Sequence, residues 1–266
     1  EFEDEEGKLH RKNRPLPEVA EELIARCGGF PKSFNGILFF EDAGKITECR
    51  EPHKFWGEVQ NRISTVSIAQ GQGYATKKEI YAVMGGYTDQ YAAYTTIDHY
   101  PRIDSYYYAC EKLKEGDGTA LETLLDFFCY ETDEDRQLFT TALATPLWGG
   151  LPGKRPMFFI TSLDAHGSGK SEAAAAIGKL YGGYISLERD VADLKTRILS
   201  SAEATNKRVI IRDNLKAWGW SDQDFESFIT SDIISGRRNH MGEGRMPNYF
   251  TVLVTGNGAS LDTDIA

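Results

Sequence analysis

The chain has little cysteine and no long apolar run. Its 266 residues contain four cysteines, Cys27, Cys49, Cys110 and Cys129, without a CxxC pair. This spacing does not favour a zinc site, and reduced, partly buried thiols are the simpler interpretation. No stretch approaches the ~20 apolar residues of a membrane-spanning helix, and the polar start EFEDEEGKLHRKNR is unlike a signal peptide. We expect a cytoplasmic protein with no membrane partner.

Positive charge is also scarce. The chain has 30 Lys and Arg against 40 Asp and Glu, which gives a net charge of -10. A protein of this charge does not coat nucleic acid with its whole surface, although it can carry a local basic patch. The segment from Glu111 to Arg136 has nine acids and three bases, whereas SGRRNHMGEGR has three arginines, one histidine and one acid. We expect any anionic polymer to meet the second segment.

The sequence pattern along the chain changes near PLWGGLPGKRP, where glycine and proline residues cluster. We therefore expect an accessory α+β or helical domain over residues 1–150 and an α/β core over residues 151–266. The sequence before residue 150 predicts helices over residues 15–29, 51–64 and 75–86, and a hairpin over residues 36–49. Two amphipathic helices are expected between residues 118 and 149. The tyrosine-rich run YAAYTTIDHYPRIDSYYYA can stack on bases or pack in half-buried strands, and packing is the favoured interpretation.

Four short apolar segments alternate with helical ones in the downstream part. They read MFFITS, YISL, RVIIRDN and FTVLVTG. Such alternation predicts a mainly parallel sheet covered by helices, with ligands at the carboxyl ends of the strands.

A glycine-rich turn joins the first of these segments to an alanine-rich helix in FFITSLDAHGSGKSEAAAAIG, residues 158–178. It resembles a phosphate-binding loop, except that Asp164 replaces the first glycine of the pattern. In this hypothesis Lys170 pairs with the β- and γ-phosphates of ATP, and Ser171 holds Mg²⁺. The alternative is an ordinary loop of small residues. The candidate nucleotide-binding residues are Ala165, His166, Gly167, Ser168, Gly169, Lys170, Ser171 and Glu172.

Two further strand ends carry polar residues suited to a nucleotide site. Asp213 ends the strand VIIRD and is the expected second Mg²⁺ ligand beside Ser171. Asn214 follows where a water-activating glutamate is usual, and an amide orients water but does not accept its proton. Asn257 ends FTVLVTGN, where a polar sensor can bind the attacking water or the γ-phosphate. The predicted catalytic residues are Lys170, Asp213, Asn214 and Asn257. For Asp213 and Asn257 taken singly, an ordinary turn is the competing interpretation.

With these motifs in order, the chain resembles the superfamily III helicases of the AAA+ class, in particular the helicase parts of phage and mobile-element replication proteins of the virulence-associated E and primase-helicase type. The resemblance rests on GSGKS, VIIRDN, FTVLVTGN and SDIISGRRNHMGEGRMPNYF, and is looser before Pro156. It implies a P-loop ATPase core and a homo-oligomeric, hexameric ring around single-stranded or forked DNA. It also implies a hairpin whose basic tip grips the DNA backbone, and the candidate DNA contacts are Arg237, Arg238, His240 and Arg245.

Three interpretations of the arginine segment stay open: contacts to DNA, contacts to the nucleotide of a neighbouring subunit, and a solvated loop. The chain lacks an initial methionine and stops nine residues after Asn257. We expect a fragment that lacks the lid and arginine-bearing segment of this family, and whose parent chain can carry a primase or polymerase domain.

Two functions are compatible with these residues. The first is an ATP-dependent DNA helicase or translocase that hydrolyses ATP between subunits of a ring. The second is a nucleotide-binding assembly switch or loader in replication that does not translocate, which Asn214 and the acidic charge favour. A small-molecule kinase would not need the arginine hairpin or Asn257.

Overall fold

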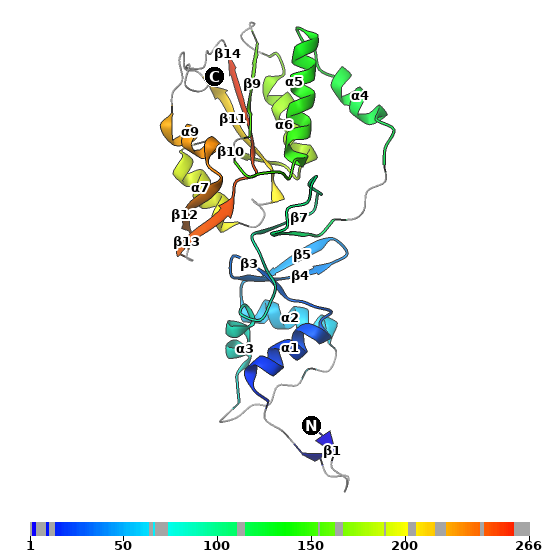
Figure 1. Ribbon diagram of the computed structural model, residues 1–266, viewed down its shortest axis with the longest axis vertical. Helices are drawn as coiled ribbons and strands as arrows, with labels where there is room; N and C mark the ends of the chain where they lie inside the picture. Colours follow the sequence, from blue (N-terminus) through cyan, green and yellow to red (C-terminus); the bar gives the residue numbers. More distant parts are fainter. Residues whose placement is uncertain are drawn as a thin grey trace. The chain divides into compact units, whose positions relative to one another are not determined.

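The chain forms two compact units, Glu1–Tyr91 and Ala92–Ala266. Both are traced in the computed structural model of Figure 1. The structure describes residues 2–3, 9–10, 14–63, 66, 74–110, 115–153, 155–162, 167–188, 190–201, 206–215, 222–239 and 242–257. We expected a boundary at residue 150, but residues 92–150 fall in the second unit.

The first unit is an α+β arrangement. Its sheet has the order β5-β4-β3-β6, in which β3 and β6 are parallel and the other pairs antiparallel. Its elements are β1 (Phe2–Glu3), β2 (Leu9–His10), α1 (Leu16–Arg26), β3 (Lys32–Phe34), β4 (Ile37–Asp42), β5 (Lys45–Cys49), α2 (Pro52–Arg62), α3 (Lys77–Met84) and β6 (Gln90–Tyr91). The expected helices and the hairpin are thus confirmed.

Local sequence signals account for these elements. A proline opens both α1 and α2, where its missing N–H costs nothing. Helix α3 begins with a capping box, in which the backbone N–H of Glu79 donates to the Thr76 hydroxyl and the Glu79 carboxylate accepts from the Thr76 backbone. Leu38 and Phe40 of β4 pack with Phe55 of α2 in the core of the unit.

All four cysteines are outside disulfides. Cys27 and Cys49 are buried in the core of the first unit, Cys110 is half-buried and Cys129 is exposed. Burial raises the pKa of the Cys49 thiol to about 12. Cys49 is therefore a neutral core residue rather than a nucleophile.

The second unit is mixed α/β and contains a four-stranded parallel sheet. The strand order is β10-β11-β14-β9, so β14 lies between β11 and β9. All four predicted apolar segments form its strands. The elements of the unit are β7 (Ala93–Thr95), β8 (Tyr106–Tyr108), α4 (Thr119–Asp126), α5 (Asp133–Ala144), the 3₁₀ helix η1 (Thr145–Leu147), β9 (Met157–Ser162), α6 (Lys170–Leu180), β10 (Tyr184–Ser186), α7 (Val191–Ser200), β11 (Val209–Leu215), α9 (Gln223–Thr230), β12 (Ile233–Arg238), β13 (Gly242–Pro247) and β14 (Thr251–Asn257).

Alternating residues of the central strands face two hydrophobic layers. Val209, Ile211 and Leu253 pack with α4, α5 and α6 on one face of the sheet. Ile210 and Val252 pack with α7, α9 and the β12–β13 hairpin on the other. Figure 1 shows α5 and α6 on one side of the sheet and α7 and α9 on the other.

This layering explains why the expected boundary at residue 150 is displaced. Leu125 of α4 and Phe139 of α5 belong to the same buried cluster as Ile177 of α6. In addition, Tyr100 forms a parallel β-bridge with Trp148, in the glycine- and proline-rich segment where we expected the domain boundary. The turn-forming residues therefore lie within the second unit and do not separate two domains.

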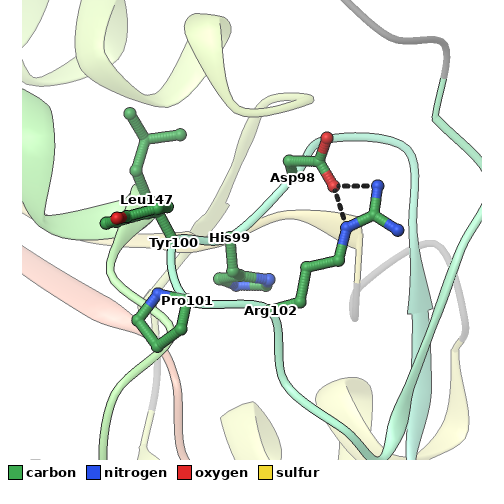
Figure 2. Close-up of a pocket in the computed structure, with 6 residues that line it drawn as sticks. All are labelled: Asp98, His99, Tyr100, Pro101, Arg102 and Leu147. Carbon is green, nitrogen blue, oxygen red and sulfur yellow. Dashed lines mark hydrogen bonds and ion pairs between the residues drawn. The ribbon is translucent and has the colours of Figure 1, made fainter.

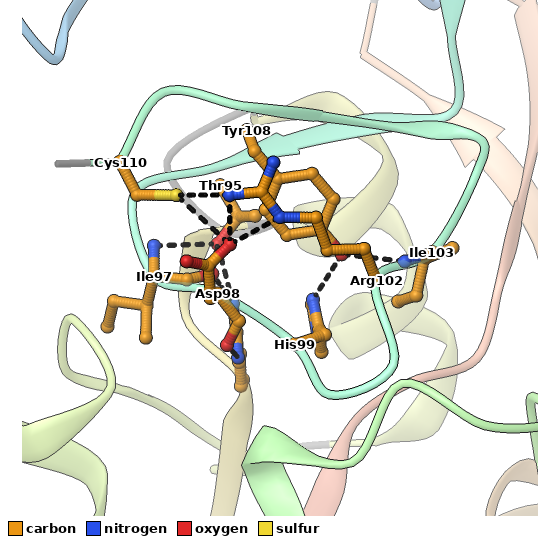
Figure 3. A network of polar contacts seen from close by, with 9 residues as sticks. Thr95, Ile97, Asp98, His99, Arg102, Ile103, Tyr108 and Cys110 are labelled. Carbon is orange, nitrogen blue, oxygen red and sulfur yellow. Dashed lines mark hydrogen bonds and ion pairs between the residues drawn. The ribbon is translucent and has the colours of Figure 1, made fainter. Parts of the chain in front are cut away.

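Most of the tyrosine-rich run packs, as expected. Tyr94 and Tyr106 are buried, whereas Tyr100 is 86% exposed. The hydroxyl of Tyr108 accepts a hydrogen bond of 2.8 Å from the backbone of Ile103 and lies 2.9 Å from Nδ1 of His99 (Figure 3). These bonds fold residues 92–110 into a compact loop structure at the edge of the unit.

A buried arginine attaches this loop structure to the sheet. Arg208 immediately precedes β11 and is 3% exposed. Its guanidinium donates to the carbonyls of Asp98, Pro146 and Ile97 and to the Thr95 hydroxyl. Burial lowers the pKa of Arg208 to about 10, so the group remains charged near neutral pH. One side chain thus joins residues 95–98, η1 and β11.

No helix in the described part of the chain has the length and apolar character needed to cross a membrane.

We expect Arg208→Lys to lower the free energy of unfolding by about 3 kcal/mol. A lysine ammonium cannot reach the separated carbonyls that the planar guanidinium joins, so buried acceptors lose their donors. Urea denaturation measures the change. Arg136→Lys is the control, because Arg136 makes surface ion pairs with Glu122 and Asp126 and should lose less than about 1 kcal/mol. Equal losses would contradict the assigned role of Arg208.

The stability of the protein should also depend on His99. Burial, assisted by the nearby charges of Arg208 and Arg155, lowers the pKa of His99 from 6.5 to about 3. Because the folded pKa is below the unfolded one, the unfolded chain takes up the proton first as the pH falls. The contribution of neutral His99 to the free energy of unfolding is therefore complete above about pH 6.5. It decreases toward about pH 3, by about 1 kcal/mol per pH unit.

The measurement is urea denaturation of wild type and His99→Gln between about pH 7 and pH 5. The variant should show a smaller loss of stability on acidification, whatever its stability at neutral pH. His53→Gln is the control because His53 is exposed beside Glu51. The same pH dependence in wild type and His99→Gln would show that His99 does not cause the effect.

Candidate functional site

The glycine-rich turn lies between the end of β9 and the start of α6. Gly167 and Gly169 have φ values of 83° and 78°, in the left-handed region that favours glycine. A Cβ atom at either position would meet no atom within 4 Å, so backbone conformation rather than crowding calls for glycine here. Helix α6 begins directly afterwards at Lys170. Its first N–H groups lack helical partners and can bind an anion.

Lys170 extends its ammonium group to two hydroxyls. Nζ lies 2.9 Å from Oγ of Ser162, at the end of β9, and 2.7 Å from Oγ of Ser168. The two serine oxygens are themselves 3.0 Å apart. Among the described residues Lys170 has no carboxylate partner. Its positive charge is therefore held in position by neutral groups and is not neutralised by them.

Asp213 lies opposite the start of α6 and accepts two hydroxyl hydrogen bonds on one oxygen. Ser171 donates to Oδ1 at 2.6 Å, and Thr255 of β14 donates to the same atom at 2.5 Å. Partial burial alone would raise the pKa of Asp213. The hydrogen bonds from Ser171, Thr255 and the backbone N–H of Asn214 outweigh it and hold the pKa below its usual value. Asp213 is therefore a carboxylate at neutral pH.

The ladder between β11 and β14 is irregular at this point. Arg212 pairs with Val254 and Leu215 with Gly256, so Asp213 and Asn214 together face Thr255. Asn214 has a φ of 57°, and its backbone N–H donates to the Thr255 hydroxyl at 2.9 Å. Two residues opposite one define a β-bulge, a feature that often re-aims side chains near active sites.

Asn257 ends β14 beside β9. It pairs in register with Ser162 of β9, whose hydroxyl contacts Lys170. The amide oxygen Oδ1 of Asn257 is buried and has no hydrogen-bond partner among the described residues. A buried polar atom without a partner is costly, and such atoms are often satisfied by water or a ligand.

The structure thus brings Lys170, Ser171, Asp213 and Asn257 to the carboxyl ends of three neighbouring strands. Glu172 points along α6, where its carboxylate pairs with Lys179 at 3.1 Å. Asn214 is exposed on the bulge. Three of the predicted residues, Ala165, His166 and His240, lie outside the described residues, as does Asp164.

Sequence reasoning missed Ser162 and Thr255 as members of this cluster. Thr255 and Asn257 are two residues apart on one strand, so both fall on the face of Leu253. That alternation was visible in FTVLVTGN and could have identified Thr255. Ser162 is the last residue of β9, and its contact with Lys170 depends on the course of the turn, which the sequence does not specify.

The cluster can also be tested as a magnesium site. Ser171 and Asp213 supply a hydroxyl and a carboxylate whose oxygens lie 2.6 Å apart, and Mg²⁺ prefers such oxygen ligands, with water completing its shell. The described residues contain no group of three or more His, Cys, Asp or Glu side chains arranged to hold a metal ion. A metal held here would therefore need oxygens from water or a phosphate as well.

The arginine segment forms an antiparallel hairpin, β12–β13, in which Arg237 pairs with Glu243 and Arg245 with Ser235. Paired residues share a face, so Arg237 and Arg245 are on the same exposed face. Arg238 is on the opposite face, where its side chain covers Gly244 and leaves no room for a Cβ atom. The hairpin packs on α7.

Asn248, between the end of the hairpin and β14, holds the hairpin in place by hydrogen bonds. Its side-chain amide donates to the carbonyls of Phe228 and Ser231 at 2.8 and 3.1 Å. Its backbone N–H donates to Asp232 at 2.9 Å. Asn248 is 3% exposed, so these bonds are shielded from water. The arginines therefore project from a fixed ribbon on the face of the sheet opposite α6.

A shallow pocket of about 520 Å³ lies near the amino ends of the strands, away from this cluster. Figure 2 shows its lining, which is Asp98, His99, Tyr100, Pro101, Arg102 and Leu147. The carboxylate of Asp98 pairs with Arg102 and also accepts from the Cys110 thiol (Figure 3). The carboxylate of Asp98 and the guanidinium of Arg102 therefore pair with each other, whereas Nε2 of His99 is buried and has no hydrogen-bond partner among the described residues.

Comparison with solved structures shows a fold that this chain shares with another protein. No protein-family model and no curated protein matches the chain. Among solved structures, the chain is similar to the A-form apo structure of the NrS-1 C-terminal region, with a TM-score of 0.53 and 12% identity over 94% of this chain. A second A-form apo structure of that region gives a TM-score of 0.52 and 13% identity over 91% of this chain. The chain spans 58% and 57% of the lengths of those two chains.

Proposed function

We propose that the chain is the ATP-binding core of a phage or mobile-element replication protein, in which ATP hydrolysis drives movement on DNA. One observation carries the proposal: Lys170, Ser171, Asp213 and Asn257 converge at the carboxyl ends of β9, β11 and β14. Ligands of parallel α/β sheets bind at this edge. The fold shared with the NrS-1 C-terminal region and the motif resemblance to superfamily III helicases support the same assignment.

The geometry favours a phosphate ligand. Among the described residues, the ammonium group of Lys170 contacts two serine hydroxyls and no carboxylate, so it retains its attraction for an anion. The N-terminus of α6 adds unpaired N–H groups and the positive end of the helix dipole at the same place. Lys170 would contact the β- and γ-phosphates, and the left-handed glycines let backbone amides turn inward.

Ser171 and Asp213 would hold Mg²⁺, which when bound neutralises charge on the phosphate oxygens. The lowered pKa of Asp213 keeps its carboxylate ionised for that role. Asn257 would orient the attacking water, which can donate to its amide oxygen Oδ1, a buried atom with no partner among the described residues, or it would donate from its side-chain NH₂ to the γ-phosphate. Asn214 cannot accept a proton, so the proton of the attacking water must pass to another group.

The β12–β13 hairpin is the proposed DNA contact. Arg237 and Arg245 share an exposed face and present two guanidiniums, which bind phosphate oxygens in a forked geometry. Because ATP of this class of enzyme sits between subunits, we propose a homo-oligomeric ring, of six subunits by the resemblance. A non-translocating assembly switch is the second candidate function, and the presence of Asn214 in place of an acid favours it.

We expect Lys170→Ala to reduce ATP turnover by at least ~100-fold, because it removes the charge that faces the phosphates. The measurement is ATP hydrolysis over a range of protein concentrations, with and without single-stranded DNA. Lys179→Ala is the control, since Lys179 lies on the same helix and pairs with exposed Glu172. Turnover that rises with DNA supports the motor. Binding of ATP with little turnover in wild type supports the switch, and no ATP binding contradicts both.

Removal of the outward arginines should weaken DNA binding. For Arg237→Ala and Arg245→Ala, we expect the slope of log affinity against log salt to fall in magnitude by about 0.7 to 1 each. Arg238→Ala should change that slope less, because its side chain lies over Gly244 on the other face. Fluorescence anisotropy with single-stranded DNA measures the slopes, and Arg136→Ala on α5 serves as the control. Unchanged slopes for both outward variants would refute the hairpin contact.

A further inference from the structure

The bulge between β11 and β14 changes which hydrophobic layer the side chains of β11 face. Before it, Ile210 faces the α7 and α9 layer and Ile211 faces the α6 layer. After it, Leu215 also faces the α7 and α9 layer. A regular strand would put Leu215 on the face of Ile211, four residues earlier. The extra residue therefore shifts the alternation by one, at the point where the chain leaves the sheet.

A bulge leaves backbone groups without their ladder partners, and here a side chain satisfies one of them. The Thr255 hydroxyl accepts from the backbone N–H of Asn214 at 2.9 Å and donates to Oδ1 of Asp213 at 2.5 Å. Thr255 is 1% exposed, so both bonds start from a buried hydroxyl. One hydroxyl thus ties both residues of the bulge to β14.

Asp213 has a second restraint at the same oxygen, from Ser171 at 2.6 Å. The bond from Thr255 comes from the sheet, whereas that from Ser171 comes from the first turn of α6. Without Thr255, the carboxylate would lose one of its two side-chain hydrogen bonds, and the backbone N–H of Asn214 would lose its acceptor on β14. Asn214 also holds a left-handed conformation that is uncommon for residues other than glycine.

We propose that Thr255 is a positioning residue of the nucleotide site, which fixes the bulge so that the Asp213 carboxylate stays beside Ser171 for metal-assisted nucleotide binding. This inference rests on the proposed function. Thr255 acts through Asp213 and does not itself touch the nucleotide.

The same strand provides a matched control. Thr251 begins β14 and is 0% exposed, but its hydroxyl has no hydrogen-bond partner among the described residues. Thr251→Val and Thr255→Val therefore make the same chemical change in one buried strand. Only the second removes hydrogen bonds, since valine keeps the shape of threonine and lacks the hydroxyl. Thr255→Ser restores the hydroxyl.

The test compares the affinity for a fluorescent ATP analogue in excess Mg²⁺ and in EDTA, using the full chain. For wild type, Mg²⁺ should strengthen binding. For Thr255→Val we expect this gain to fall by about 10-fold or more, as for other groups that orient a metal ligand. Affinity in EDTA should stay within about threefold of wild type, because Lys170 and the helix N-terminus remain. Thr255→Ser and Thr251→Val should keep the gain of wild type.

The outcomes separate this inference from the proposed function. No Mg²⁺-dependent binding of the analogue by wild type would overturn the proposed function. A full Mg²⁺-dependent gain in a folded Thr255→Val would overturn the role of Thr255 and leave the proposed function intact. Circular dichroism and thermal unfolding check the fold of each variant. If Thr255→Val does not fold, Thr255→Cys takes its place, because a thiol keeps the volume but is a weak donor and acceptor.

Discussion

The parallel pairing of β14 with both β9 and β11 is the constraint on which the second unit depends. This strand is buried from Thr251 to Gly256, and its two neighbours carry the glycine-rich turn and Asp213. Register along β14 places Asn257 beside Ser162 and Thr255 beside the bulge. A slip of one residue would turn Leu253 out of the α6 layer and Thr255 away from Asp213. The hydrophobic layers on both faces therefore fix the polar cluster as well as the core.

Much of this arrangement could be predicted from the sequence, because it follows from local patterns. The four apolar strand segments and the arginine hairpin are visible as alternating or apolar runs between turn residues. The rule that ligands meet the carboxyl ends of parallel strands also anticipated the approach of Ser171 and Asp213. Strand order was not predictable in this way, since the position of β14 between two strands earlier in the chain depends on long-range pairing.

The errors and omissions have identifiable physical causes. The boundary at residue 150 was inferred from clustered glycine and proline, yet Trp148 pairs with Tyr100 and so ties that turn into the second unit. Arg208 was interpreted as part of a strand, and its role depends on carbonyl groups 62 to 111 positions away, which no local pattern reveals. The bulge opposite Thr255 is a property of two strands together. Neither strand alone shows that Asp213 and Asn214 share one partner.

The pinned base of the β12–β13 hairpin sets how the arginine ribbon can move. Only three residues separate β13 from β14, and Asn248 among them is fastened to the end of α9 by its amide. This connection is too short to absorb a displacement of the hairpin. A displacement of Arg245 would therefore act through the backbone on Thr251, where β14 begins between its two parallel neighbours. The hairpin and β14 are therefore coupled through a short segment that is held in place at Asn248.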